Sequence, residues 1–494
     1  MALKWLGGGK PDHPLADEKG AKETLAALPA ADPFKCIEEI RDWIESVLAT
    51  EGFKPDRRTE LVLLLDASVQ AHQRKLLRDY LANPRLPKIQ EGRLWSALFG
   101  LWKDLAGAYA SCLAQLGADS GSAGRIKAQW PLASVRAVRA VAAQLKWHYM
   151  HYERAEAAVW QDLGKVYRFA EDRKLGRESV NLYPGVPVAS SAEREFMKAL
   201  MLAASSPDCL LPLEIELAER IVAHFSDSFL ISNVNQPQST YYCIDLAQGL
   251  PPKRLTQAPP PSPGQRFFAA GAAQARLDDM IKIVASGAVP ADLNLGGSYE
   301  AGQVLGVLHH LKMYWATTPP VRKHDRYSVK HRINVVNGFE GVLGRLQGAD
   351  GGESWVIDNI SAGGIGAGLE KIQGDWLRIG SLVGVQVEGG SGSLSVGVIR
   401  RCNRLPKQQM SVGLQTFAKE AYAVQLGGGE PALLLNDGRA LKEEVLLCLK
   451  EGAFDRRVSP TMAFEQRNCL LIPNELVESR DGFELARYRV MQQS

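Results

Sequence analysis

The chain has 494 residues, of which 46% are hydrophobic and 23% charged, and its formal net charge is +3. This composition is that of a folded, water-soluble protein, and the charge is too small for a protein that wraps a long nucleic acid. At about 100–200 residues per domain, the length predicts several folding units.

The seven cysteines are odd in number, widely spaced and without a Cys-x-x-Cys pair. This pattern favours reduced thiols over a disulfide framework or a structural zinc site. No apolar run approaches the roughly 20 residues of a membrane span. The first residues also lack the apolar region of a signal peptide. We therefore expect a soluble, unexported, cytoplasmic protein.

The first half of the chain is predicted to be helical. Asp32 precedes Pro33, so a capping carboxylate comes directly before a proline in the first helical turn. Apolar residues follow at helical spacing. Further helices are predicted at residues 59–81, 93–116 and 131–170.

The last of these helices contains Trp160-x-x-Leu163-Gly164-x-x-Tyr167, which fits half of a tetratricopeptide consensus. No second copy occurs at the expected period of about 34 residues, so we interpret it as a helix–helix contact.

The pattern becomes mixed after residue 175. Gly, Pro and Ser interrupt the helical pattern over residues 175–192, and Ser190-x-x-Glu193 is predicted to be the capping box of a further helix. Later helices are predicted at 213–225, 272–286 and 298–315, and a small strand pair at 229–232 and 239–246.

Hydrophobic alternation with a period of two begins after Pro320, which indicates strands. Six short strands separated by turns predict a small antiparallel barrel. They are predicted at 327–335, 341–346, 354–357, 382–388, 394–400 and 410–417. The tail has further β-like runs at 444–449, 469–472 and 484–490, which indicate an additional small β-domain.

The predicted fold class is therefore a multidomain α+β protein with a mainly helical N-terminal region. The barrel lies near the C-terminus. The expected segments are a helical domain (1–185), a mixed helix and strand segment (186–257), a Pro-rich linker (258–264), a helical segment (265–318), the barrel (319–426) and a small β-rich domain (427–494).

Positive charge is concentrated in the predicted barrel. Residues 321–426 contain 13 Lys/Arg and 9 Asp/Glu, whereas the remainder of the chain contains 45 Lys/Arg and 46 Asp/Glu. A local basic excess suits a small anionic ligand better than a long polyanion, which needs a larger basic face.

Two short motifs flank the first strands of the barrel. Arg322-Lys-His-Asp-Arg326 comes just before the first strand, and Asn359-Ile-Ser361-Ala-Gly363-Gly364 follows the third. Arginine can grip a phosphate or the O6/N7 edge of guanine and can stack on a base. The amide, the hydroxyl and the exposed glycine backbone add hydrogen bonds and room for a ligand. Together these groups suit a guanine nucleotide with two phosphates, and none is arranged to break a bond.

At these motifs the segment 320–426 resembles the PilZ domain family, which is marked by RxxxR followed by [D/N]xSxxG. Gly397-Val-Ile-Arg400 and Ser411-Val-Gly413-Leu-Gln-Thr-Phe417 look like the closing strands of that family. The resemblance implies a β-barrel that binds cyclic di-GMP. The ligand-binding residues that it implies are Arg322, Arg326, Asn359, Ser361, Gly363 and Gly364.

The resemblance also bears on stoichiometry, because Val321 is apolar where some members carry another basic residue. This difference favours one ligand molecule per barrel. Taken singly, the arginines are also compatible with solvated surface charges, and the second motif with an ordinary turn, since Asn, Ser and Gly are turn residues.

Other patterns carry weaker signals. His148 and His151 have a spacing that can hold a metal, with Glu153 and Glu156 nearby, but their aromatic neighbours favour packed histidines. Gly364-x-Gly366-x-Gly368 is not a dinucleotide fingerprint, because no helix is predicted to follow it. We predict no metal, no cofactor and no catalytic residue.

The favoured hypothesis is a bacterial cyclic-di-GMP effector that is not an enzyme. Its helical region would contact a protein partner, and no DNA, RNA or membrane span is expected. By analogy with the family, the output would be motility, adhesion or exopolysaccharide control. Two alternatives remain: an enzyme with an active site within residues 1–255 that the barrel regulates, and a structural scaffold whose barrel binds no ligand.

Overall fold

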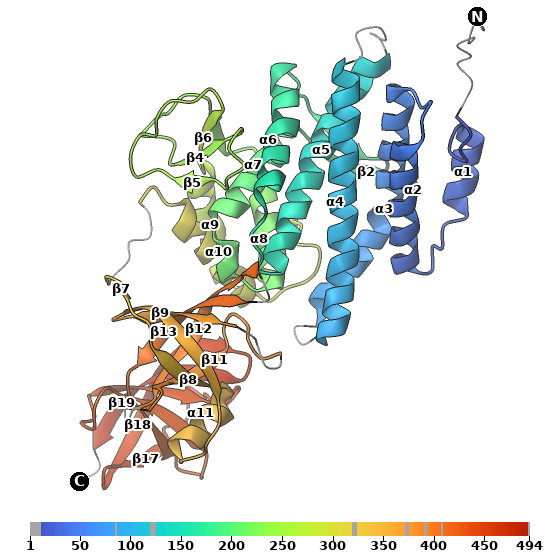
Figure 1. Ribbon diagram of the computed structural model, residues 1–494. Coiled ribbons are helices and arrows are strands. Elements are labelled where there is room, and N and C mark those ends of the chain that lie inside the picture. Colours follow the sequence, from blue (N-terminus) through green and yellow to red (C-terminus); the bar gives the residue numbers. More distant parts are fainter. Residues whose placement is uncertain are drawn as a thin grey trace, which may run out of the picture. The chain divides into compact units, whose positions relative to one another are not determined.

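The computed structural model describes residues 11–83, 86–118, 125–318, 324–370, 375–389, 393–406 and 409–492. It confirms the predicted α+β class, with a mainly helical N-terminal part and two small β-barrels in the C-terminal part (Figure 1). The chain forms two compact units. The helical unit comprises Met1–Pro207 and Pro212–Pro320, and the barrel unit comprises Asp208–Leu211 and Val321–Ser494.

In the described residues of the helical unit, ten α-helices supply most of the hydrophobic core. They are α1 (Glu18–Ala26), α2 (Pro33–Ala49), α3 (Pro55–Ala82), α4 (Lys88–Ala118), α5 (Arg125–Met150), α6 (Ala157–Asp172), α7 (Ala192–Ala204), α8 (Pro212–His224), α9 (Ala273–Ala285) and α10 (Ala301–Trp315). Neighbours in this order pack side by side from α2 to α6 (Figure 1). As predicted, Asp32 caps α2, because its side chain accepts hydrogen bonds from the backbone N–H groups of Phe34 and Lys35.

The single helix predicted for residues 131–170 is two helices, so that prediction was wrong. The chain leaves the helical conformation after Met150, where Tyr152 has a φ of 57°. Glu153 then accepts from His151 at 2.7 Å, which holds the connecting turn. Aromatic spacing alone did not show this break, because the apolar pattern continues into α6.

A β-hairpin occupies the segment in which no regular structure was predicted. Its strands are β1 (Val180–Tyr183) and β2 (Val186–Ser190). The helix that follows is capped by Ser191, whose hydroxyl accepts from the backbone N–H of Arg194. Ser190 therefore does not cap α7 as predicted. Its hydroxyl instead donates to Glu195 at 2.6 Å.

The predicted strand pair belongs to a larger sheet of four strands. In sheet order these are β3 (Leu230–Ser232), β6 (Gln265–Ala269), β4 (Tyr242–Asp245) and β5 (Lys253–Arg254). The two predicted strands are thus separated by β6. The Pro-rich residues 258–264 lie within the helical unit and lead into β6.

The first barrel is a closed sheet of six antiparallel strands. In sheet order these are β10 (Gly364–Leu369), β13 (Met410–Ala418), β12 (Ser395–Arg404), β11 (Leu382–Val387), β8 (Arg332–Asn337) and β9 (Glu353–Ser361). Pairing of β9 with β10 closes the barrel, and the short β7 (Tyr327–Ser328) pairs with the end of β9, beyond the residues of β9 that pair with β8.

The strand predicted at 341–346 is wrong, because those residues belong to α11 (Gly338–Leu346). Phe339, Val342 and Leu343 are its buried residues, and their spacing is helical. The sixth barrel strand is instead β10, which the glycine content of residues 364–368 concealed.

The second barrel is nearly closed and follows at once. In sheet order its strands are β14 (Ala421–Gln425), β15 (Pro431–Leu435), β16 (Glu444–Leu449), β19 (Phe483–Gln492), β18 (Arg467–Arg480) and β17 (Thr461–Phe464). A bridge between Leu426 and Met462 joins its two edges. The barrels share a hydrophobic cluster, which contains Val396 and Val398 of the first and Leu433 and Phe483 of the second.

Candidate functional site

The second sequence motif forms one end of the β9–β10 hairpin. Asn359 and Ser361 end β9, and Gly364 begins β10 as the cross-strand partner of Ser361. Only Ala362 and Gly363 lie between these partners, so the turn is tight. The Ser361 hydroxyl donates to the carbonyl of Gly364 at 3.2 Å, which ties the two strands together across the turn.

The described part of the first motif, residues 324–326, lies beside this hairpin. Arg322 falls outside the described residues. Arg326 is exposed and immediately precedes β7, in which Tyr327 pairs with Ile360 and Ser328 pairs with Asn359. Continuing that register places Arg326 level with Ser361, so the two predicted motifs meet at the same end of β9.

The described residues that directly precede β7, 324–326, are called the pre-strand arm. His324 belongs to this arm and lies against the hairpin turn. A Cβ atom built on Gly363 would lie 3.1 Å from Cδ2 of His324. The absence of a side chain at Gly363 therefore lets the arm approach the turn closely.

The outward face of β10 is formed by glycine. Ala367 and Leu369 are buried, so the alternating residues Gly364, Gly366 and Gly368 lie on the outer face. A Cβ atom on Gly366 would come within 2.6 Å of Nδ2 and 2.9 Å of Oδ1 of Asn359. The Asn359 amide therefore occupies the space that a side chain at position 366 would need.

The carboxylate of Asp358, which precedes Asn359, is paired with a lysine. Asp358 accepts from Lys330 Nζ at 2.5 Å. This pairing offsets a carboxylate that would otherwise repel an anionic ligand at the hairpin.

Sequence reasoning missed two residues of this surface, Gly366 and Gln415. Gln415 of β13 is exposed and is the cross-strand partner of Gly364. Ser361, Gly364 and Gln415 thus form one row across three strands. The glycine spacing 364, 366, 368 was visible in the sequence, but only the strand assignment shows that these residues share a face.

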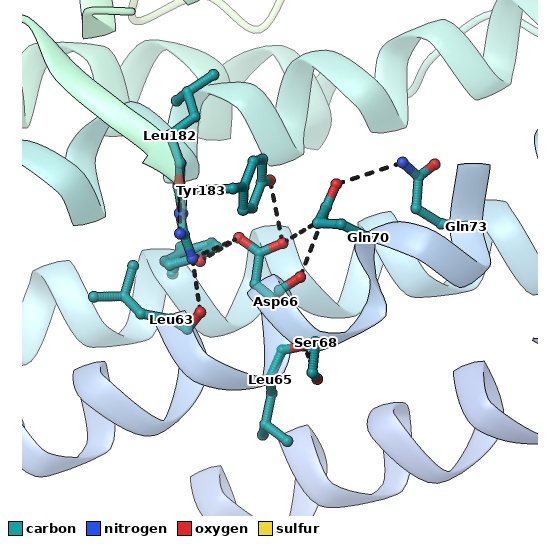
Figure 2. Close-up of polar contacts among 10 residues, drawn as sticks. Leu63, Leu65, Asp66, Ser68, Gln70, Gln73, Leu182 and Tyr183 are labelled. Carbon is teal, nitrogen blue, oxygen red and sulfur yellow. Dashed lines mark hydrogen bonds and ion pairs between the residues drawn. The ribbon is translucent and has the colours of Figure 1, made fainter. Parts of the chain in front are cut away.

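The helical unit contains a buried polar cluster around Asp66 (Figure 2). The Asp66 carboxylate accepts from Tyr109 at 2.6 Å, from Gln70 at 2.8 Å and from Tyr183 at 3.3 Å. Arg136 lies 3.4 Å from it and donates to the carbonyl oxygens of Leu63 and Leu182.

The ionisation of Asp66 in this cluster is perturbed, as is common in active sites, but the cluster is not accessible to a substrate. Burial raises the pKa of Asp66, while the charge of Arg136 opposes that rise. Asp66 is 1% exposed, Arg136 3% and Tyr109 0%. A substrate cannot reach the cluster in this conformation. We assign it to fold stability, because its groups bind one another and the backbone.

The histidines singled out in the sequence lie at the end of α5. His151 bonds Glu153 and stacks on Trp95, and Nδ1 of His148 lies 3.6 Å from Glu153 Oε2. Among the described residues, no group of three or more His, Cys, Asp or Glu is placed to hold a metal ion. In the same part of the chain, no helix is both long and apolar enough to cross a membrane.

Comparison with known protein families adds an independent finding. Residues 19–238 match the model of the family described as "Cyclic-di-GMP receptor FimW, N-terminal domain". The match covers α1 to α8 and ends before the barrels. No curated protein matches the chain.

The match supports a cyclic-di-GMP receptor without identifying the family of the barrel. It concerns the helical unit, whereas the two motifs that were predicted to bind a ligand lie in the barrel unit. The family match and the predicted motifs therefore concern different parts of the chain.

Proposed function

We propose that this protein is a non-catalytic cyclic-di-GMP effector of the bacterial cytoplasm and that its ligand binds at the outer face of the first barrel. The proposal rests on one observation above all: Arg326 and the hairpin residues Asn359, Ser361 and Gly364 come together at the end of β9. The match of residues 19–238 to the N-terminal domain of a cyclic-di-GMP receptor family supports the same ligand.

Each predicted residue has a role in this proposal. Arg322 and Arg326 grip guanine and phosphate from the segment before β7, because guanidinium groups bind both bidentately. The Asn359 amide donates from the barrel wall, the Ser361 hydroxyl that donates to Gly364 accepts from the ligand, and Gly363 and Gly364 leave space for the ligand. One ligand molecule binds per barrel.

Calorimetry on the full chain tests the site. Wild type should bind cyclic di-GMP with saturable heat. Arg326→Ala should bind at least about tenfold more weakly, because a charge-assisted hydrogen bond contributes about 1.5–3 kcal/mol.

The matched control is Arg332→Ala, which removes an exposed arginine at the start of β8 in the same barrel. This variant should bind nearly as wild type does. Equal losses in both variants would mean general attraction to positive charge rather than a site. Folded wild type that gives no heat would favour the scaffold alternative.

The enzyme alternative has less support. Its best candidate among the described residues is the Asp66 cluster, and that cluster is sealed from solvent. We further propose that ligand binding changes how residues 324–326 contact the hairpin, which gives a two-state element that a partner of the helical unit can sense.

Affinity capture from the native bacterium tests this output. A partner that wild type binds only with, or only without, cyclic di-GMP should lose that dependence with Arg326→Ala. A partner captured equally under all conditions would contradict ligand control.

A further inference from the structure

A chain of hydrogen bonds connects the second barrel to the outer face of the first. Arg400 of β12 donates from Nε to Oε1 of Gln415 at 2.8 Å. Its two terminal nitrogens donate to the two carboxylate oxygens of Glu478 at 2.6 and 2.5 Å. Glu478 belongs to β18 of the second barrel and also accepts from Arg480 at 2.8 Å.

The Glu478 end of this chain is firmly held. The Glu478 side chain is only 13% exposed. Although burial alone would raise its pKa, hydrogen bonds and charge from Arg400 and Arg480 lower it, so the carboxylate stays ionised. Arg400 therefore has an ionised partner and a hydrogen bond from each of its three nitrogens, and it acts as a support rather than as a phosphate ligand.

The Gln415 end lies next to the candidate ligand site. Gln415 is exposed and pairs with Gly364, which has no side chain to cover it. Gly364 in turn pairs with Ser361. With neighbouring strands about 4.8 Å apart, Gln415 lies roughly 10 Å from Ser361 along the same face.

The orientation of the Gln415 amide follows from its partner. Because Arg400 Nε is a donor, the amide oxygen must face it, which leaves the amide N–H groups for a ligand. Guanine presents two acceptors, O6 and N7, on one edge, whereas adenine presents an N6 donor where guanine has O6. A fixed amide donor that faces the group at position 6 of the base thus matches O6 of guanine and opposes N6 of adenine.

We propose that Gln415 is a specificity-determining residue that donates to the guanine edge of the ligand. We further propose that the second barrel acts as its positioning element through Glu478 and Arg400. The inference rests on the proposed function and adds a reason for the second barrel, which the two sequence motifs do not explain.

Base selectivity tests this inference better than affinity does. Removing Glu478 also makes the surface more positive, which would strengthen binding of any cyclic dinucleotide. Cyclic di-AMP has the same two phosphates, so this charge effect cancels in the ratio of the two dissociation constants. The full chain is titrated with cyclic di-GMP, and cyclic di-AMP is added as a competitor.

Gln415→Ala should lower the preference for guanine about tenfold, the value expected for loss of one base-edge hydrogen bond. Glu478→Gln should lower it similarly, because the support of Arg400 is lost. The double variant should be no less selective than Gln415→Ala alone, since both changes act on one contact.

Two further variants guard the result. Glu475→Gln removes a carboxylate from the same strand that pairs with Arg487 at 3.0 Å, and it should keep wild-type selectivity. Arg400→Lys keeps the charge but loses the planar set of donors, so it should lower the preference for guanine as Glu478→Gln does. It tests the same link if Glu478→Gln folds poorly.

Each outcome decides the question. Wild-type selectivity in Gln415→Ala would overturn the role of Gln415. Lost selectivity in Gln415→Ala, with wild-type selectivity in folded Glu478→Gln and Arg400→Lys, would overturn the role of the second barrel. Absence of cyclic-di-GMP binding to wild type would instead overturn the proposed function and this inference with it.

Discussion

Gly366 controls where the amide of Asn359 lies. Because a Cβ atom at position 366 would approach that amide to 2.6 Å, Gly366→Ala should displace it. We expect a loss of cyclic-di-GMP affinity of about tenfold in calorimetry, since one hydrogen bond of about 1 kcal/mol or more is lost.

Gly368→Ala is the matched control on the same face of β10. Its Cβ atom would meet Oδ2 of Asp358 at 3.4 Å, which is an ordinary contact. If Gly368→Ala weakens binding as much as Gly366→Ala, Asn359 is not the cause.

At this scale the sequence predicted the residues of the motifs but not their partners. Asn359 and Ser361 follow from local chemistry. Gly366 and Gln415 depend on strand register, and a register shift between Gly366 and Ala367 alters the pairing of β9 with β10. Such a shift has no signature in the order of residues.

At the scale of elements, Gly164 allows α6 to pack closely on the segment after β4. A Cβ atom at this position would lie 2.2 Å from the carbonyl oxygen of Leu246, so the backbone would have to move. We expect Gly164→Ala to lower the free energy of unfolding by about 1–3 kcal/mol in denaturant titrations.

Gly107→Ala in α4 is the control, because its Cβ atom would meet nothing within 4 Å. It should stabilise the protein by about 0.5–1 kcal/mol through helix propensity. Stabilisation by both substitutions would contradict the close packing of α6. The half-match to a repeat consensus was interpreted as a helix–helix contact, but the close approach at Gly164 is to the segment after β4.

The turn between α5 and α6 should be sensitive to acid. Burial alone would raise the pKa of Glu153, but its interactions with His148 and His151 outweigh burial and lower the pKa from 4.5 to about 2. A depressed carboxyl pKa stabilises the fold above the unfolded value and loses that contribution as pH falls toward 2.

Glu153→Gln should therefore be less stable than wild type by about 1 kcal/mol at pH 6, after allowance for solvent screening. The difference should shrink when urea unfolding is repeated at pH 3. A difference that is constant between these pH values would show that the carboxylate charge is not involved.

Helices and strands with a strong hydrophobic periodicity were predictable from the sequence. Elements whose conformation is determined by tertiary packing were not. α2 carries its own cap and apolar spacing, so Asp32 and Pro33 were sufficient to place it. By contrast, residues 341–346 have a short apolar pattern that suits a strand or a helix. Burial of Phe339 and Val342 against both barrels selects the helix.

At the scale of the whole molecule, the two barrels should unfold together. Phe483 of the second barrel is 1% exposed and packs in a cluster with Val396 and Val398 of the first. We expect Phe483→Ala to cost about 3–5 kcal/mol. Hydrogen exchange should then quicken in β11 and β12 as well as in β19. Faster exchange in the second barrel alone would show that the barrels are independent.

The most direct test of the central claim is hydrogen exchange of the full chain with and without saturating cyclic di-GMP. The family match lies in the helical unit and the motifs lie in the barrel unit, so the location of ligand protection decides between them. We predict slower exchange in peptides that contain β7 and the β9–β10 hairpin. Protection confined to α1–α8, with the hairpin unchanged, would contradict the proposed site.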